Sequence, residues 1–241
     1  MIAGKKLFLF LFVTFFQYFT IDIKAAQTSA EHLPGFVDIT GFGSSSAEMF
    51  FDIWKVQSLS STSAQTDYRL VADKLQGNVI QATARASVAG LTRKLEIDPQ
   101  QYPFVTWSWK VSATLDMADL TRKESDDSPA RLMVSFGRDY SKGGRPEGTL
   151  CYVWATDEVK GSFTLNPYSP DIMVIVVASG EEKIGTWQQY RRNLVDDYHR
   201  AFGEPPKKIR AVTLLSDTDN TGAQVDAWYG SVRFERETAD P

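Results

Sequence analysis

The chain has 241 residues, of which 43% are hydrophobic, and its 26 basic and 30 acidic side chains give a formal net charge of −4 at pH 7. An acidic chain without a basic stripe argues against binding to nucleic acid or to an anionic membrane surface. Cys151 is the only cysteine, which excludes an intramolecular disulfide, and its position in the apolar run LCYVW predicts a buried structural thiol.

The N-terminus has the pattern of a secretory signal peptide. Lys5 and Lys6 precede an apolar run over residues 7–19, and two small residues end the segment. This run is shorter than the roughly 20 residues of a membrane-spanning helix. We therefore expect residues 1–26 to be removed on export, leaving no stable membrane anchor. Residues 27–241 are then expected to form a single domain in the periplasm or outside the cell.

The first half of the mature chain contains short apolar runs separated by glycine and proline, the pattern of strands and turns. Strands are expected over residues 51–56, 68–72, 79–84, 95–97 and 102–111. In the last of these, Val105, Trp107, Trp109 and Val111 alternate with polar residues. A period of two predicts a strand with one buried face, so both tryptophans are expected in the core.

The second half continues with strands and one helix. Strands are predicted over residues 131–136, 150–154, 172–178, 185–193 and in the two apolar runs of residues 208–234. Leu194, Tyr198 and Phe202 recur every four residues between Asn193, a good N-cap, and Gly203, which favours helix termination. This pattern predicts a short surface helix over residues 194–202. The whole chain is predicted to be an all-β jelly-roll sandwich with that one helix.

An acidic turn is expected where the last two strands meet. Asp217, Asp219, Asn220 and Thr221 offer the hard oxygen atoms that Ca²⁺ prefers. A helix-loop-helix calcium motif is absent from the sequence. Three interpretations stay open: a structural turn, a Ca²⁺ site, and polar contacts to a ligand.

Two further groups of charged residues are candidates for function. Asp126 and Asp127 precede a strand that carries Arg131, an arrangement that suits either an acid/base pair or a salt bridge beside a solvated loop. Arg192, with Arg191 beside it, can hold a carboxylate or sugar hydroxyls, or take part in a structural ion-pair network. Serine-nucleophile, zinc and phosphate-loop motifs are absent from the sequence.

Taken together, these motifs resemble the bacterial family catalogued as domain of unknown function 3047, over about residues 51–234. The matching motifs are Trp107-Ser-Trp109, Asp126-Asp127 with Arg131, Tyr152-Val-Trp154, Gly185-Thr-Trp187 with Arg192-Asn193, Asp196-Asp197-Tyr198, Phe202-Gly203, and residues 217–221 with Tyr229-Gly230. The resemblance implies an exported protein without an assigned activity. The final strand-turn-strand is also similar to the galactose-binding-like jelly rolls, which include carbohydrate-binding modules.

We expect a binding protein rather than an enzyme, with a glycan or another small polar, polyhydroxylated molecule as its ligand. Motif membership selects the candidate ligand-binding residues Asp126, Asp127, Arg131, Trp154, Trp187 and Arg192, and the candidate Ca²⁺ ligands Asp217, Asp219, Asn220 and Thr221. One alternative is a hydrolase or lyase that uses Asp126 and Asp127, with Arg131 stabilising negative charge. Another is a structural protein of the cell envelope.

Overall fold

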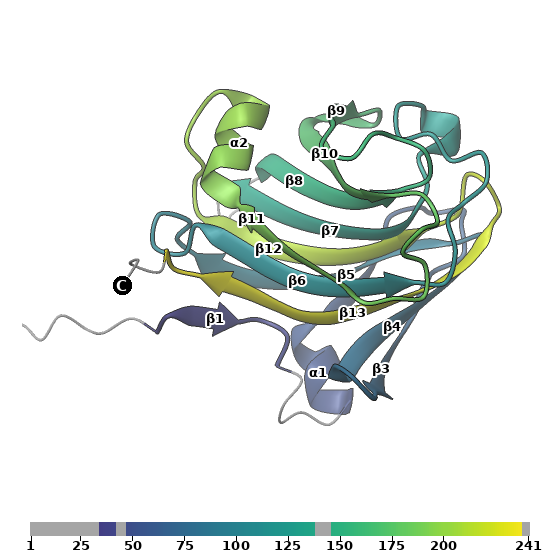
Figure 1. Ribbon diagram of the computed structural model, residues 1–241, viewed down its shortest axis with the longest axis horizontal. Helices are drawn as coiled ribbons and strands as arrows, with labels where there is room; N and C mark the ends of the chain where they lie inside the picture. The colour runs from purple at the N-terminus through teal and green to yellow at the C-terminus, as the bar shows by residue number, and fades with distance from the viewer. Residues whose placement is uncertain (1–33, 42–46, 138–145, 238–241) are drawn as a thin grey trace, which may run out of the picture. The chain divides into compact units, whose positions relative to one another are not determined.

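The computed structural model describes residues 34–41, 47–137 and 146–237, and these residues form two facing β-sheets (Figure 1). One sheet has six strands in the order β11-β6-β13-β4-β3, with β1 paired to β13, and the other has seven in the order β2-β5-β12-β7-β8-β10-β9. The predicted all-β jelly-roll sandwich is therefore confirmed. The predicted signal peptide, residues 1–26, lies outside the described residues.

The elements of each sheet have the following bounds. The six-stranded sheet contains β1 (Phe36–Asp38), β3 (Asp67–Asp73), β4 (Gly77–Arg85), β6 (Phe104–Val111), β11 (Gln188–Asn193) and β13 (Gln224–Glu235). The seven-stranded sheet contains β2 (Lys55–Ser58), β5 (Val88–Ile97), β7 (Ser128–Gly137), β8 (Pro146–Ala155), β9 (Phe163–Asn166), β10 (Ser169–Ser179) and β12 (Ile209–Asp217). The helices are α1 (Ala47–Ile53), α2 (Leu194–Phe202) and the 3₁₀ turn η2 (Lys123–Ser125).

The main core lies between the two sheets. Val105, Trp107, Trp109 and Val111 of β6 are all buried there, as the alternation in the sequence predicts. The ring of Trp107 contacts those of Trp109 and Tyr152, with centroids 5.5 and 5.0 Å apart. Aromatic side chains bury the largest apolar areas of any residue, so this group is a principal source of stability.

Helix α2 has the bounds predicted from the sequence. The Asn193 side chain accepts hydrogen bonds from the backbone N–H groups of Val195 and Asp196, which would otherwise lack a partner at the helix start. Gly203 ends the helix with φ of 77°, a conformation that favours glycine. Tyr198 packs over Gly148 of β8, where any larger side chain would meet its ring. The helix is thus attached to the end of the seven-stranded sheet.

The strand predicted over residues 51–56 is wrong in its first half. Residues 47–53 form α1 instead, and β2 begins only at Lys55. Phe50 and Trp54 stand four residues apart and stack with ring centroids 5.9 Å apart, both buried against the core. Tertiary packing of these two rings determines the helical turn, which the local sequence did not reveal. Strands β1 and β9 were also missed.

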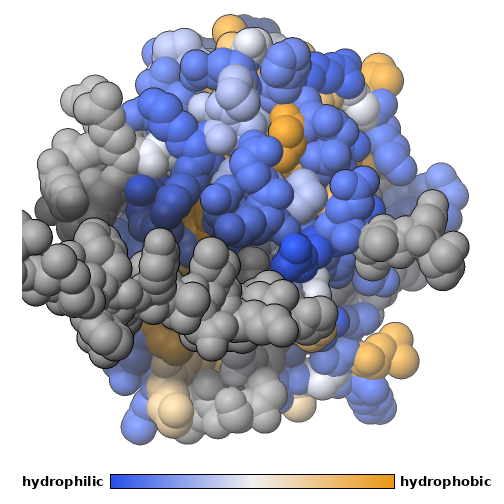
Figure 2. Space-filling model, turned by 90° about the vertical axis from the view of Figure 1, so that its left-hand side faces the viewer, coloured by the Kyte–Doolittle hydropathy of each residue, from blue (hydrophilic) through white to orange (hydrophobic). Residues whose placement is uncertain are grey.

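The surface seen in Figure 2, at the end of the sandwich that carries α2, is mostly hydrophilic where the described residues are visible. Its hydrophobic residues are scattered singly, which is normal for a folded protein. Among the described residues, no helix combines the length and the hydropathy needed to cross a membrane.

Candidate functional site

A cavity of about 800 Å³ lies on the outer face of the seven-stranded sheet, opposite the main core. Along β7, Arg131, Met133 and Ser135 line the cavity, whereas Leu132 and Val134 between them belong to the core. The same alternation places Thr213 and Leu215 of β12 on the cavity floor. The strand period of two therefore assigns one face of the sheet to packing and the other to the cavity.

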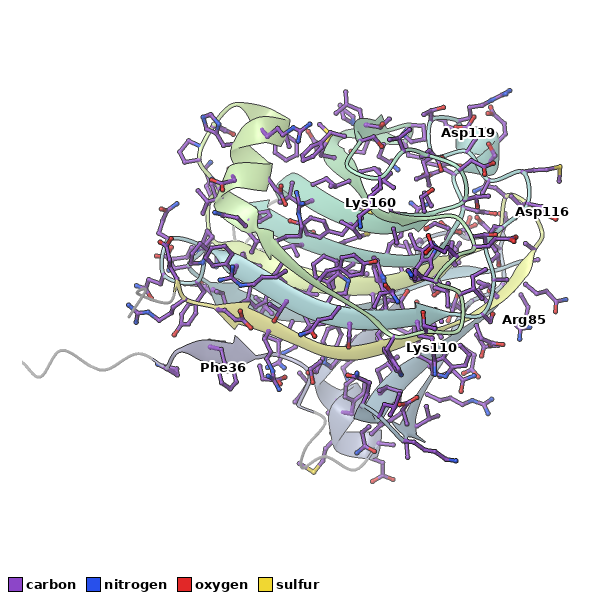
Figure 3. All side chains as sticks on the ribbon, viewed as in Figure 1. Phe36, Arg85, Lys110, Asp116, Asp119 and Lys160 are labelled. Carbon is purple, nitrogen blue, oxygen red and sulfur yellow. The ribbon has the colours of Figure 1, made fainter. Side chains whose placement is uncertain are left out.

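Loops surround this floor. The segment between β6 and β7 covers the outer face of β8 and β10, where Leu120 packs against Cys151, Val153 and Val176. Asp116 and Asp119 of this segment lie at the end of the sandwich opposite α2 (Figure 3). The turn between β12 and β13 lies at the same end (Figure 1). The loops thus leave the outer face of β5, β12 and β7 accessible as a cavity.

Arg131 and Asp126 form a buried ion pair that lines the cavity. Nη2 of Arg131 donates to Oδ1 of Asp126 at 2.9 Å and to its carbonyl oxygen at 2.8 Å, and Nε donates to Ser128 Oγ at 2.7 Å. Burial opposes the charge of Arg131, but Asp126 and the other acidic groups nearby, Asp217 among them, together outweigh burial and raise the pKa of the guanidinium. Asn166 donates to the other oxygen of Asp126 at 2.8 Å. The salt bridge considered from the sequence is confirmed.

Asp127 points away from Asp126 and positions the turn between β12 and β13. Its carboxylate accepts hydrogen bonds from the backbone N–H and the hydroxyl of Thr221, each at 2.7 Å. It also accepts from the backbone and side-chain nitrogens of Asn220, at 3.3 and 3.2 Å. Asp126 and Asp127 lie in the connection between η2 and β7, where Asp126 has φ of −72° and ψ of 61°, and their carboxylates have separate sets of hydrogen-bond partners.

Asp217 and Asp219 bring two more carboxylates to the wall of the cavity. Asp217 ends β12 and is buried, and its Oδ1 has no hydrogen-bond partner among the described residues. Burial raises the pKa of Asp217 well above its ordinary value; Asp127 and Asp219 add to this effect, and Arg131 opposes it in part. Asp219 is half-buried, and it accepts a hydrogen bond from Ser63 Oγ at 2.6 Å.

Four residues that the sequence proposed for ligand binding do not line the cavity: Asp127, Trp154, Trp187 and Arg192. Trp154 is fully buried on the core side of β8, so it has no ring face available to a ligand. Trp187 lies beside Lys110 of the six-stranded sheet, 5.1 Å from its Nζ to the ring centroid. Arg192 pairs with Asp197 of α2 and so takes part in the structural ion pair considered as its alternative role.

Sequence reasoning missed other residues at the cavity. Asn166 ends β9, Tyr168 lies in the turn between β9 and β10, and Ser60 and Ser61 come from the loop after β2. Tyr168 is 57% exposed at the cavity, and its hydroxyl donates to the carbonyl of Lys123 at 2.6 Å. A short strand followed by an Asn and an aromatic residue was the available signal, but β9 itself was not predicted.

Cys151 lies on the cavity side of β8 and is buried, which confirms the predicted structural thiol. Burial raises its pKa to about 12. At pH 8 only about one thiol in ten thousand is then ionised, and the thiolate is the reactive form. We expect Ellman's reagent to leave the native protein unmodified at pH 8 and to label one thiol per chain in 6 M guanidinium chloride. Rapid labelling of the native protein would contradict this.

The chain was compared with curated sequences, solved structures and family models. No curated protein sequence matches the chain. Among solved structures, the family 11 carbohydrate-binding module of the cellulosomal cellulase Lic26A-Cel5E of Clostridium thermocellum superposes with a TM-score of 0.47 and 9% identity, covering 84% of this chain and 95% of the module. The family 30 carbohydrate-binding module of the cellulosomal cellulase Cel9D-Cel44B of the same organism gives 0.46 and 10%, covering 85% and 99%.

One sequence family matches the greater part of the chain. The family model aligns with residues 52–233, which run from the last residues of α1 to two residues before the end of β13. The matched region therefore contains the seven-stranded sheet, the six-stranded sheet except β1 and the end of β13, and the residues described above as lining the cavity. The chain belongs to the family described as protein of unknown function (DUF3047).

Proposed function

We propose that the protein, after export, binds a glycan or another polyhydroxylated molecule in the cavity on the outer face of the seven-stranded sheet. The observation that carries this proposal is the cavity itself, with about 800 Å³ and a lining that combines hydroxyl, amide and charged side chains with apolar ones. Small-molecule sites of proteins have about this volume and combine apolar surface with a few convergent polar groups.

The polar groups match the chemistry of sugar hydroxyls, which both donate and accept hydrogen bonds. Nη1 of Arg131 has no acceptor among the described residues, so it is available as a planar donor at the floor. Asp219 and Asn220 add a carboxylate and an amide on the wall. Hydrogen bonds that involve a charged partner are the stronger ones, so Arg131 and Asp219 are expected to contribute most to affinity.

Tyr168 supplies an exposed aromatic ring at the edge of the cavity. An aromatic ring offers a large, rigid contact surface, and the apolar C–H face of a sugar can pack on it. The proposal thus replaces the tryptophans selected from the sequence by Tyr168.

We expect Tyr168→Ala to weaken binding of a soluble glycan at least tenfold, which corresponds to about 1.4 kcal/mol. A panel of soluble glycans is first screened with the wild-type protein by calorimetry, and the best ligand is then titrated into each variant. Phe36→Ala is the matched control, because Phe36 is an exposed aromatic residue of β1 outside the cavity. The absence of binding across the panel, or equal losses in the two variants, would contradict the proposal.

The alternative of a hydrolase or lyase that uses Asp126 and Asp127 receives less support. Such an enzyme needs both carboxylates at the reacting bond, but the four hydrogen bonds from Asn220 and Thr221 hold Asp127 at the turn. Asp126 is likewise held by Arg131 and Asn166. Chromatography of each bound glycan after overnight incubation tests this point, and cleavage products would favour the enzyme.

A further inference from the structure

We infer that Asp127, Asp217 and Asp219 together bind one Ca²⁺ ion at the wall of the cavity. The three side chains come from two parts of the chain. Asp127 immediately precedes β7, whereas Asp217 ends β12 and Asp219 lies in the turn that follows. The inference goes beyond the proposed function, because it assigns a metal site that requires no glycan, although Asp219 belongs to both sites.

The first observation is geometric. One carboxylate oxygen from each of the three residues lies within 4.8 Å of the others. Ca²⁺ binds oxygen at about 2.3–2.6 Å, so oxygens on opposite sides of the ion are separated by roughly 5 Å. A single Ca²⁺ therefore fits among the three carboxylates without a rearrangement of the strands.

The second observation does not depend on the distances between the three carboxylates. Asp217 is only 7% exposed, and its Oδ1 is a buried polar atom without a hydrogen-bond partner among the described residues. Such an atom is costly in a folded protein unless a partner completes it. A cation between the three carboxylates is the partner that this oxygen lacks.

The charges around the site favour a cation as well. Arg131 is the nearby positive group, and its closest carboxylate is that of Asp126, at 2.9 Å. Asp127, Asp217 and Asp219 remain as a group of three acidic side chains, two of them buried. Two like charges held close together inside a protein are unfavourable, and an ion of charge +2 offsets most of this cost.

The donor atoms indicate the kind of ion. All three are carboxylate oxygens, which suit hard cations such as Ca²⁺ rather than Zn²⁺ or copper. Ca²⁺ takes six to eight oxygens, so coordination positions remain for water or for ligand oxygens in the cavity. Thr221 and Asn220, which the sequence proposed as ligands, donate hydrogen bonds to Asp127 and orient its carboxylate.

The test compares four proteins after removal of metal by chelator: the wild type, Asp219→Asn, Asp217→Asn and the control Asp52→Asn, which removes an exposed carboxylate of α1. Calcium binding is measured by calorimetry, and the thermal midpoint is measured with and without Ca²⁺ in the absence of any glycan. At a hundred times the dissociation constant, the wild-type and control midpoints should rise by about 5–10 °C. Asp219→Asn should weaken Ca²⁺ at least tenfold.

Asp217→Asn distinguishes a calcium ligand from a residue that only stabilises the fold. Without Ca²⁺, its midpoint should equal or exceed that of the wild type, because an amide can donate to the neighbouring carboxylates, yet its calcium shift should be lost. The inference is overturned if metal-free wild type shows neither heat nor a shift with Ca²⁺. It is equally overturned if both variants at the site bind Ca²⁺ as tightly as the Asp52→Asn control.

Discussion

Arg131→Met is expected to lower the free energy of unfolding by about 3–5 kcal/mol. The Arg131 and Asp126 side chains are only 5% and 3% exposed. Methionine fills much of the same space but leaves the carboxylate of Asp126 buried without its cation. Removing one partner of a buried ion pair is strongly destabilising for this reason, even where the intact pair contributes little net stability. Urea denaturation of the purified protein measures the loss.

Two comparisons make this result specific. Arg69→Met removes the cation of the exposed pair with Asp67, whose Nε and Oδ2 are 2.7 Å apart, and should cost less than about 1 kcal/mol. Adding Asp126→Asn to Arg131→Met removes the unpaired charge and should restore part of the loss. A double variant no more stable than Arg131→Met alone would show that the lost packing, and not the unpaired carboxylate, causes the destabilisation.

Trp107→Ala is expected to destabilise the protein by about 3–5 kcal/mol. Trp107 is 2% exposed and lies between Trp109, Tyr152 and Tyr190, with the Tyr190 ring stacked at 5.2 Å. Alanine would leave a large void between the sheets, because three aromatic rings on two sheets cannot all move to fill it.

The matched control for this experiment is Trp228→Ala. Trp228 is only partly buried, on β13 of the same sheet, with Lys110 Nζ 4.7 Å from its ring centroid. Its ring keeps contact with water in the native state, so its removal should cost less than half as much. Chemical denaturation with fluorescence and circular dichroism checks both variants. Equal losses at the two positions would mean that the aromatic group around Trp107 is not the dominant packing unit.

The local pattern of the sequence predicted much of the fold. Alternation in β6 predicted which of its residues belong to the main core, and the caps at Asn193 and Gly203 predicted both ends of α2. These predictions succeeded because side-chain period and capping depend on residues within a few positions of each other. They failed at α1, where the distant core that Phe50 and Trp54 contact determines the conformation.

The candidate site required the tertiary structure. The sequence by itself determined that the chain is acidic, predicted a β-sandwich, and selected Asp126, Asp127, Arg131 and the acidic turn as candidate polar residues. Only the tertiary structure decided that Asp127 accepts hydrogen bonds from the turn about 90 positions later in the chain. It also decided that Asp126 lines the cavity and that Trp154 packs in the core. The register of β7 against β12 and β8 sets these directions, and pairing between distant strands has no local signal in the sequence.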